Sequence, residues 1–247
     1  AYVDCDVEEP NGHLFLKPTI EHREPVTLLV PHVLAEACDH CGRCAQVCQY
    51  SALVWLGDKP LVFPELCHSC GGCALVCPKK AIPEVPREIG AVETGHAGHV
   101  RFIHGLLNVG ESKSPPVIRA VRAAAPDDSW QIIDAPPGTS CPVVTTIRDC
   151  DFVLLATEPT PFGLHDLTLA VETVRQIGVR MGVIINRADI GDDRVATYCA
   201  AEGIPVLLTI PDDRRIAEAY SRGELLVTTR PDLRGALAGL WEQVERM

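Results

Sequence analysis

The stretch CDHCGRCAQVC (38–48) and its second copy CHSCGGCALVCP (67–78) place eight cysteines in two runs of one pattern, with Cys67 lying 29 residues after Cys38. In each run three cysteines stand three residues apart and a fourth follows four residues later. Three cysteines at this spacing can wrap one tight loop around three corners of an iron–sulfur cubane, and the last cysteine of such a run ligates the other cluster. The two runs therefore predict two 4Fe-4S clusters.

The crossed closure of the two runs gives each cluster its fourth ligand. The first cluster takes Cys38, Cys41, Cys44 and Cys77, and the second takes Cys67, Cys70, Cys73 and Cys48. A zinc site would use four cysteines in two pairs and leave the others idle, and a disulfide framework needs an oxidising compartment. We therefore prefer the two clusters.

The composition is that of a globular protein with room for one large and one small domain. The chain has 247 residues, of which 47% are hydrophobic and 22% charged. The net charge of −11 argues against a nucleic-acid partner, because phosphate binding rests on clustered Lys and Arg. No run approaches the roughly 20 apolar residues of a membrane span, and no basic leader precedes the cysteines. A reducing cytoplasm suits the chain best.

The cysteine segment interrupts a larger pattern. Residues 36–85 have few long apolar side chains and lie between Pro31 and Pro86, so we expect an inserted domain whose clusters supply much of its folding free energy. Its internal repeat implies two copies of a short loop–helix unit. Residues 1–35 and 86–247 then form the two parts of one larger domain.

The larger domain reads as α/β. Short apolar runs predict buried strands at 132–133, 152–155, 183–185 and 206–210. Helical periodicity occupies 164–177 and 192–202, and a last helix covers about 232–246. This alternation predicts a doubly wound, mostly parallel sheet with helices on both faces.

Acidic and polar residues follow several of the predicted strands. The strand 130–133 ends in Asp134, and a loop containing Gly138 comes next, which is how a P-loop nucleotidase places a carboxylate near Mg²⁺. Any buried strand can also end in Asp and turn through Pro-Gly, so this segment alone is a weak signal. Segments 4–11, 185–189 and 210–213 repeat the arrangement, and we expect four strand ends to point at one crevice.

At the segments DCDVEEPN (4–11), HGLLNVGE (104–111), DAPPGTSCPVV (134–144), ATEPTPFGLHDL (156–167) and IINRAD (184–189), the chain resembles the MinD/ParA/Mrp class of P-loop ATPases. Within that class it is similar to members with an inserted bacterial-ferredoxin-like α+β domain. The resemblance covers essentially the whole chain. It implies a P-loop NTPase fold, with the insertion between the switch I region and the next strand.

The resemblance also implies roles for single residues. Asp6 would sit in switch I and position water or Mg²⁺, and Asp134 would be the Walker B carboxylate. The residues implied in nucleotide binding are Asp4, Gly138 of switch II, Asn186 against the adenine, and the backbone edge at Pro211 and Asp212.

The function implied is an iron–sulfur ATPase that closes around ATP as a homodimer, or as a dimer with a paralogous ATPase. ATP binding and hydrolysis would be coupled to electron transfer through the clusters to a redox partner. Two alternatives stay open. One is an iron–sulfur cluster carrier or assembly scaffold with a cluster-accepting partner, and the other is a ferredoxin module docked on an inactive nucleotidase-like domain.

One part of the family pattern is missing, because no G-x-x-x-x-G-K-[ST] loop occurs in the sequence. Either this phosphate loop lies ahead of Ala1, as we expect, or the ATPase has lost it. ATP and Mg²⁺ are therefore expected as cofactors, and ATPase activity as a property, only where the loop is present.

Two further groups of side chains carry weaker signals. Cys141 invites comparison with the bridging cysteine of the nitrogenase iron protein, but we expect a buried, inert thiol. We expect His96, His99 and His104 in a polar hairpin rather than in a metal site.

Overall fold

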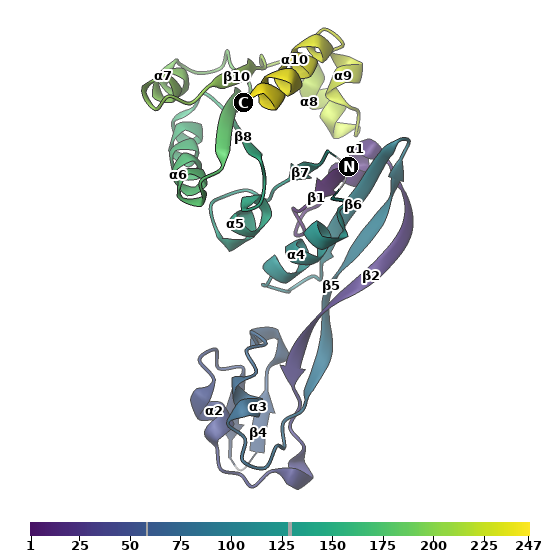
Figure 1. Cartoon of the computed structure of the whole chain (residues 1–247), viewed down its shortest axis with the longest axis vertical. Helices are drawn as coiled ribbons and strands as arrows, with labels where there is room; N and C mark the ends of the chain where they lie inside the picture. Colours follow the sequence, from purple (N-terminus) through teal and green to yellow (C-terminus); the bar gives the residue numbers. More distant parts are fainter. Residues whose placement is uncertain (58, 128–129) are drawn as a thin grey trace.

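The computed structural model describes residues 1–57, 59–127 and 130–247. Figure 1 shows an α/β body at one end, a small cysteine-rich domain at the other, and a long two-stranded ribbon between them. The ribbon is formed by β2 (Thr19–Pro31) and β5 (Glu84–Ala97), which run antiparallel. Both strands continue into the body, so the small domain is an insertion between two paired strands.

The first sheet of the body has the strand order β2-β5-β6-β1-β7. Its other strands are β1 (Tyr2–Asp4), β6 (Val100–Leu107) and β7 (Ile132–Asp134). β6 pairs antiparallel with β5, whereas β1 lies parallel to both β6 and β7. The register sets Asp4 beside Asp134, so two carboxylates meet at the ends of neighbouring parallel strands.

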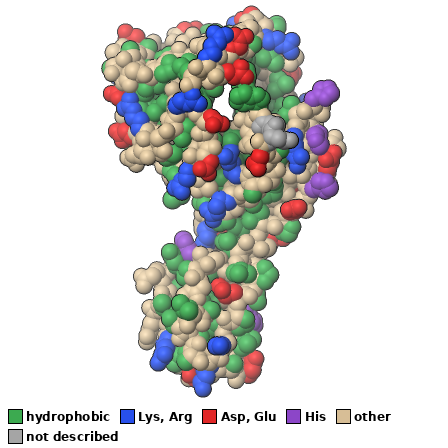
Figure 2. All heavy atoms as spheres, in the orientation of Figure 1, with side chains coloured by type: hydrophobic (Ala, Val, Ile, Leu, Met, Phe, Trp, Pro, Cys, Tyr) green, Lys and Arg blue, Asp and Glu red, His purple; other side chains and the backbone are tan. Residues whose placement is uncertain are grey.

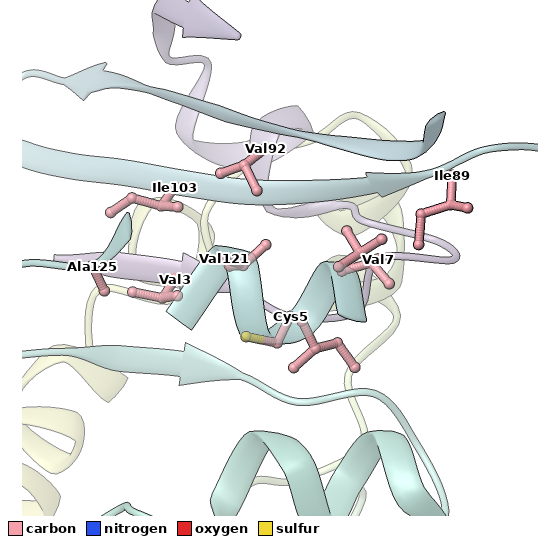
Figure 3. Packing of buried hydrophobic residues seen from close by; sticks show 10 residues of the cluster. Val3, Cys5, Val7, Ile89, Val92, Ile103, Val121 and Ala125 are labelled. Atoms are coloured by element: carbon pink, nitrogen blue, oxygen red, sulfur yellow. The ribbon is translucent and has the colours of Figure 1, made fainter. Parts of the chain in front are cut away.

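One helix covers this sheet and makes the main core. α4 (Pro115–Ala124) begins with proline, whose fixed φ suits the first turn. Its apolar face, which includes Val117 and Val121, packs on Val3 and Val7 from the segment of β1. Figure 3 shows Val3, Val7 and Val121 of this core together with Val92 of β5 and Ile103 of β6. The core therefore joins α4 to the strand that ends in Asp4.

The C-terminal part of the body carries a second, three-stranded parallel sheet in the order β10-β9-β8. Its elements are α5 (Cys141–Ile147), β8 (Phe152–Thr157), α6 (Pro161–Ile177), β9 (Arg180–Ile185), α7 (Arg194–Ala201) and β10 (Val206–Thr209). The helices α8 (Arg214–Ser221), α9 (Leu226–Thr229) and α10 (Leu233–Arg246) complete it, and α1 (Gly12–Leu16) follows β1. The α/β class and the predicted strands and long helices are confirmed.

Within the described residues, the strands of the body are grouped in two sheets. β7 is an edge of the first sheet and β8 is an edge of the second, with no strand of the described ranges between them. Figure 2 shows an opening through the molecule in this region. The long antiparallel β2–β5–β6 meander also makes the first sheet more mixed than expected.

The inserted domain holds one short hairpin, β3 (Leu53–Leu56) and β4 (Lys59–Val62), and two equivalent loop–helix units. The units contain 3₁₀ turns at Ala35–Ala37 and Pro64–Leu66, followed by α2 (Arg43–Val47) and α3 (Gly72–Leu75). Within the part of the chain that the structure describes, no helix has the length and apolar character needed to cross a membrane.

The core under α4 has no room for a side chain at Gly105. A Cβ there would lie 2.5 Å from Val7 and 2.7 Å from Val121. Gly105→Ala should cost about 1–3 kcal/mol of unfolding free energy through overpacking. In the matched control Gly239→Ala, the new Cβ meets nothing within 4 Å in the middle of α10, so helix propensity should stabilise by up to about 1 kcal/mol. Urea unfolding of the two variants measures both, and equal effects would contradict the packing described.

Candidate functional site

The two loop–helix units have the same backbone geometry, 29 residues apart. Gly42 and Gly71 precede α2 and α3 with φ of 73° and 70°, a left-handed conformation that suits glycine. His40 and Ser69, at φ of 60° and 53°, repeat the match two residues earlier. Non-glycine residues adopt this conformation at a cost. The loops that carry the cysteines are therefore built to one strained template, as the sequence repeat predicts.

The structure brings cysteines of the two runs together. A small cavity in the inserted domain is lined by Cys67, Cys70 and Cys73 of the second run and by Cys48 of the first. At the other unit, Cys77 packs against the core formed by Cys44, Leu53 and Ile82. In both places cysteines of the two runs line one small region, and Cys73 of the second run packs against the same core as Cys77.

Backbone N–H groups point at the sulfur atoms. Ser69 N donates to Cys67 Sγ at 3.4 Å, and Ala81 N donates to Cys77 Sγ at 3.3 Å. Burial raises the pKa of the Cys48 thiol, but hydrogen bonds from the backbone of residues 50–53 outweigh it and leave the pKa lowered. At Cys48 the backbone hydrogen bonds therefore favour the thiolate, the form that binds iron.

Other cysteines of the set are placed differently. Burial raises the pKa of Cys44 and Cys73, so a bound cation would be needed to hold them as thiolates. Cys41 and Cys70 are exposed, and Cys38 is half-buried. The donor set thus mixes buried and solvent-facing sulfurs around two loops. Together with the N–H···S contacts, it fits 4Fe-4S clusters held by Cys thiolates.

A second group of functional residues lies at the ends of β1 and β7. The Tyr2 hydroxyl donates to Asp134 Oδ2 at 2.7 Å. Asp4 is fully buried and accepts from Gly12 N at 3.1 Å and Asp6 N at 3.2 Å. Asp4 thereby fixes the turn that carries Asp6, while Asp134 is oriented by a phenol.

This carboxylate group is electrostatically strained. Burial and, to a smaller extent, the neighbouring Asp134 together raise the pKa of Asp4 to about 6, against the backbone hydrogen bond from Gly12. Burial also raises the pKa of Asp6, and burial and the Asp134 bond raise that of Tyr2. The carboxylates repel one another at the strand ends, but among the described residues no group of three or more His, Cys, Asp or Glu side chains is arranged to hold a metal ion.

The predicted adenine-side residues lie on the second sheet. Asn186 follows β9, with its backbone N–H bonded to Thr157 O at 2.7 Å. Asp212 follows β10, where its N–H donates to Asp189 Oδ1 at 2.6 Å and its carboxylate accepts from Arg187 at 2.8 Å. The adjacent Pro211 continues from β10 into this loop.

The expected single crevice is therefore divided. Among the described residues, no hydrogen bond or ion pair joins the Asp4–Asp134 group to the Asn186–Asp212 group. Gly138 stands apart from both as an exposed residue with φ of 93°. The physical reason is the separation of the two sheets between β7 and β8.

Sequence reasoning missed Tyr2 and misjudged Cys141. Tyr2 lies two residues before Asp4 on β1. Only the parallel pairing of β1 with β7 brings its hydroxyl to Asp134. Cys141 is exposed at the start of α5, not buried. His96 and His99 do lie at the β5–β6 hairpin, but His104 is buried and bonded to Glu93 at 2.9 Å.

Comparison with known proteins agrees with the cluster assignment. Residues 37–81 match the family model described as a 4Fe-4S dicluster domain. The chain is 34% identical, over 75% of its length and 66% of the relative's, to an uncharacterized protein of Methanocaldococcus jannaschii. It is 30% identical to an iron-sulfur cluster carrier protein of Aquifex aeolicus, over 44% of this chain and 34% of that one.

Among solved structures, the cell division ATPase MinD of Pyrococcus furiosus is similar to 58% of the chain. The match covers 65% of the MinD chain, with 23% identity and a TM-score of 0.43. The chain thus spans about two thirds, or less, of the proteins it is compared with here.

Crossed closure predicts an unequal effect of two cysteine replacements. Cys48→Ala removes a ligand of the cluster held mainly by the second run, so iron should fall from about eight to about four per chain. The matched control Cys150→Ala touches neither run and should keep full iron content. Iron and sulfide analysis, with the electron paramagnetic resonance of the reduced protein, reads the result. If Cys48→Ala instead lost the cluster held by Cys38, Cys41 and Cys44, crossed closure would be contradicted.

The buried Asp4 predicts a titration near pH 6. Because its folded pKa is raised above the unfolded value, the protonated carboxyl contributes stability at low pH that is lost as the pH rises through about 6. Infrared difference spectra between pH 5 and 7.5 should show one carboxyl that ionises in this range and disappears in Asp4→Asn. An unchanged spectrum in the variant would contradict the environment described.

Proposed function

From a chain whose α/β part resembles MinD- and ParA-type ATPases and whose residues 37–81 match a 4Fe-4S dicluster domain, we propose an iron–sulfur ATPase. It couples ATP binding and hydrolysis to electron transfer. The observation that carries the proposal is the β2–β5 ribbon, which joins the cluster domain without a break to the sheet containing Asp4 and Asp134. A continuous hydrogen-bonded connection of this kind suits communication between the two sites.

The cluster ligands are proposed as Cys38, Cys41, Cys44 and Cys77 for one cluster and Cys67, Cys70, Cys73 and Cys48 for the other. When bound, the clusters supply one-electron chemistry at potentials set by charge, hydrogen bonds to sulfur and solvent exposure. The chain contributes to this setting through Ser69 and Ala81, whose backbone N–H groups contact Sγ atoms. The exposed Cys41 and Cys70 mark faces where a redox partner could approach.

The nucleotide part of the proposal places Mg²⁺ near Asp134 and Asp6. Asp134 acts as the Walker B carboxylate, held by Tyr2, and Asp6 positions water or metal from the turn fixed by Asp4. Gly138 follows as the switch II glycine. These 247 residues contain no loop that supplies the backbone N–H cradle and the lysine for the phosphates, so this part of the proposal applies to a form of the protein that has such a loop.

The adenine would lie at the second sheet, against Asn186 and the backbone of Pro211 and Asp212. The Arg187–Asp212 ion pair and the bond from Asp212 N to Asp189 hold this edge in place. A shared nucleotide must bridge the carboxyl ends of the two sheets. We propose that closure around ATP, in a homodimer or with a paralogous ATPase, brings the two groups together.

A cluster carrier is the second candidate, favoured by the 30% identity to an iron-sulfur cluster carrier protein. The two functions differ in what leaves the protein, an electron or a whole cluster. Eight thiolate ligands favour electron transfer, because a fully coordinated cluster is hard to release. Transfer of iron and sulfide to an apo-ferredoxin at a rate faster than spontaneous loss would favour the carrier. The twelve free cysteines suit a reducing cytoplasm for either function.

The coupling has a measurable size. In a form of the protein that contains the phosphate loop, Mg-ATP should shift the cluster midpoint potential by about 45–130 mV. This corresponds to the usual coupling of about 1–3 kcal/mol, at about 59 mV per tenfold change. Cluster reduction should change the ATP affinity by the same free energy, and the 247-residue chain alone should bind ATP weakly.

Asp134→Ala should abolish ATP hydrolysis in this form, because the Mg²⁺ carboxylate is lost. Asp149→Ala, at an exposed position after α5, is the matched control and should hydrolyse ATP normally. Potentials that agree with and without Mg-ATP, with ATP affinity indifferent to cluster oxidation, would leave two independent modules. The protein would then be a ferredoxin docked on a nucleotidase-like domain.

A further inference from the structure

The ribbon loses support as it approaches the cluster domain. β6 pairs with β5 only from Gly90 to Ala97, so residues 84–88 of β5 pair with residues 27–31 of β2 and with no other strand of the described chain. We call these two segments the neck. A two-stranded ribbon is marginally stable on its own. The neck alone would therefore hold the cluster domain loosely.

The chain that leaves β6 does not turn away but follows β5 along the neck. Asn108 N donates to Ile89 O at 2.9 Å, and Asn108 Nδ2 donates to Glu88 O at 3.3 Å. These two bonds extend the edge of β6 past the end of its regular pairing. Residues 108–113 thereby reach from the body toward the cluster domain.

A buried charge network ends this path. The Glu111 side chain is 2% exposed and pairs with Arg87 of the neck and with Lys113, whose Nζ lies 3.3 Å from Oε1. Its carboxylate also accepts from Ser112 N at 3.1 Å. Burial raises the pKa of Glu111, but the bonds from Arg87 and Lys113 outweigh it and leave it lowered, so the carboxylate stays ionised. The network is a fixed electrostatic joint.

Lys113 connects this charge network to the cluster domain. Its Nζ donates to the backbone carbonyl of Glu65 at 2.5 Å, and its side chain is 11% exposed. Glu65 lies in the 3₁₀ turn Pro64–Leu66, two residues before Cys67. Lys113 is half-buried and Glu65 is exposed, and displacing this lysine would break its bonds to both the Glu111 carboxylate and the Glu65 carbonyl.

We propose that residues 108–113 are a brace that fixes the orientation of the cluster domain on its neck. Glu111 is the hub, and Lys113 is the positioning residue that holds the turn before Cys67. The brace leads directly into Ser114 and α4, which packs on Val3 and Val7 around the end of β1. The brace thereby connects the second cysteine run to the strand that ends in Asp4. The brace does not depend on the ATPase assignment.

Hydrogen–deuterium exchange of the cluster-loaded chain tests the brace. In Lys113→Ala, the amides of residues 84, 85, 87 and 88 and of residues 65–67 should exchange about tenfold faster, because the neck opens locally. The amides of residues 117–124 in α4 should keep their rates. Lys113→Arg should restore most of the protection, since a guanidinium can reach the same carbonyl. Lys59→Ala, which removes an exposed lysine of the cluster domain away from the joint, is the matched control.

Small-angle X-ray scattering reports the orientation of the cluster domain relative to the body, which a purely local defect would not change. Lys113→Ala at full iron content should broaden the distribution of distances between the two ends of the molecule, and the control should not. Glu111→Gln should act in the same direction, and Lys113→Ala decides the question where that variant fails to fold. Neck exchange and scattering equal to the unsubstituted protein, or equally altered in Lys59→Ala, would overturn the proposal.

Discussion

The constraint on which the rest of the structure depends is the packing of two short cysteine loops into one small inserted domain. The cluster domain has little apolar core beyond Leu53, Ile82 and a few small side chains, so it cannot fold on hydrophobic burial alone. Metal binding must supply much of its folding free energy. The two cysteine loops repeat the same left-handed residues 29 positions apart. The two ends of the inserted domain lie beside each other, because Pro31 of β2 pairs with Glu84 of β5, and the two strands continue from there as the paired ribbon.

The strands of the first sheet connect the inserted domain to the carboxylates at the ends of β1 and β7. β5 links the cluster domain to β6, β6 links to β1, and β1 ends in the buried Asp4 beside Asp134. α4 lies over these strands and shares its core with β1, and the segment ahead of α4 reaches the cluster domain through Lys113. Both the strand pairing and the helix packing therefore connect the two candidate sites. This double connection is the structural basis for proposing communication between them.

Features that depend on local sequence patterns could be predicted, whereas contacts between residues far apart in the chain could not. Cysteine spacing, apolar runs such as 152–155 and the turn after Asp134 are local patterns, so the insertion, the strands β7 to β10 and the long helices α6 and α10 were predictable, whereas the ribbon strands β2 and β5 were not predicted. The Tyr2–Asp134 bond joins residues 132 apart and the Lys113–Glu65 bond joins residues 48 apart. Neither has a local signature. The division between β7 and β8 is likewise a property of pairing between distant strands, which apolar runs do not specify.

Mössbauer spectroscopy of the chain enriched in ⁵⁷Fe tests the central claim most directly, because it counts the iron species without relying on activity. The account predicts that all protein-bound iron belongs to 4Fe-4S clusters, at about eight iron per chain. Reduction should place added electrons on both clusters, since both are held by complete sets of four thiolates. Iron in mononuclear tetrathiolate sites, or about four iron per chain with zinc in the remaining cysteines, would contradict it.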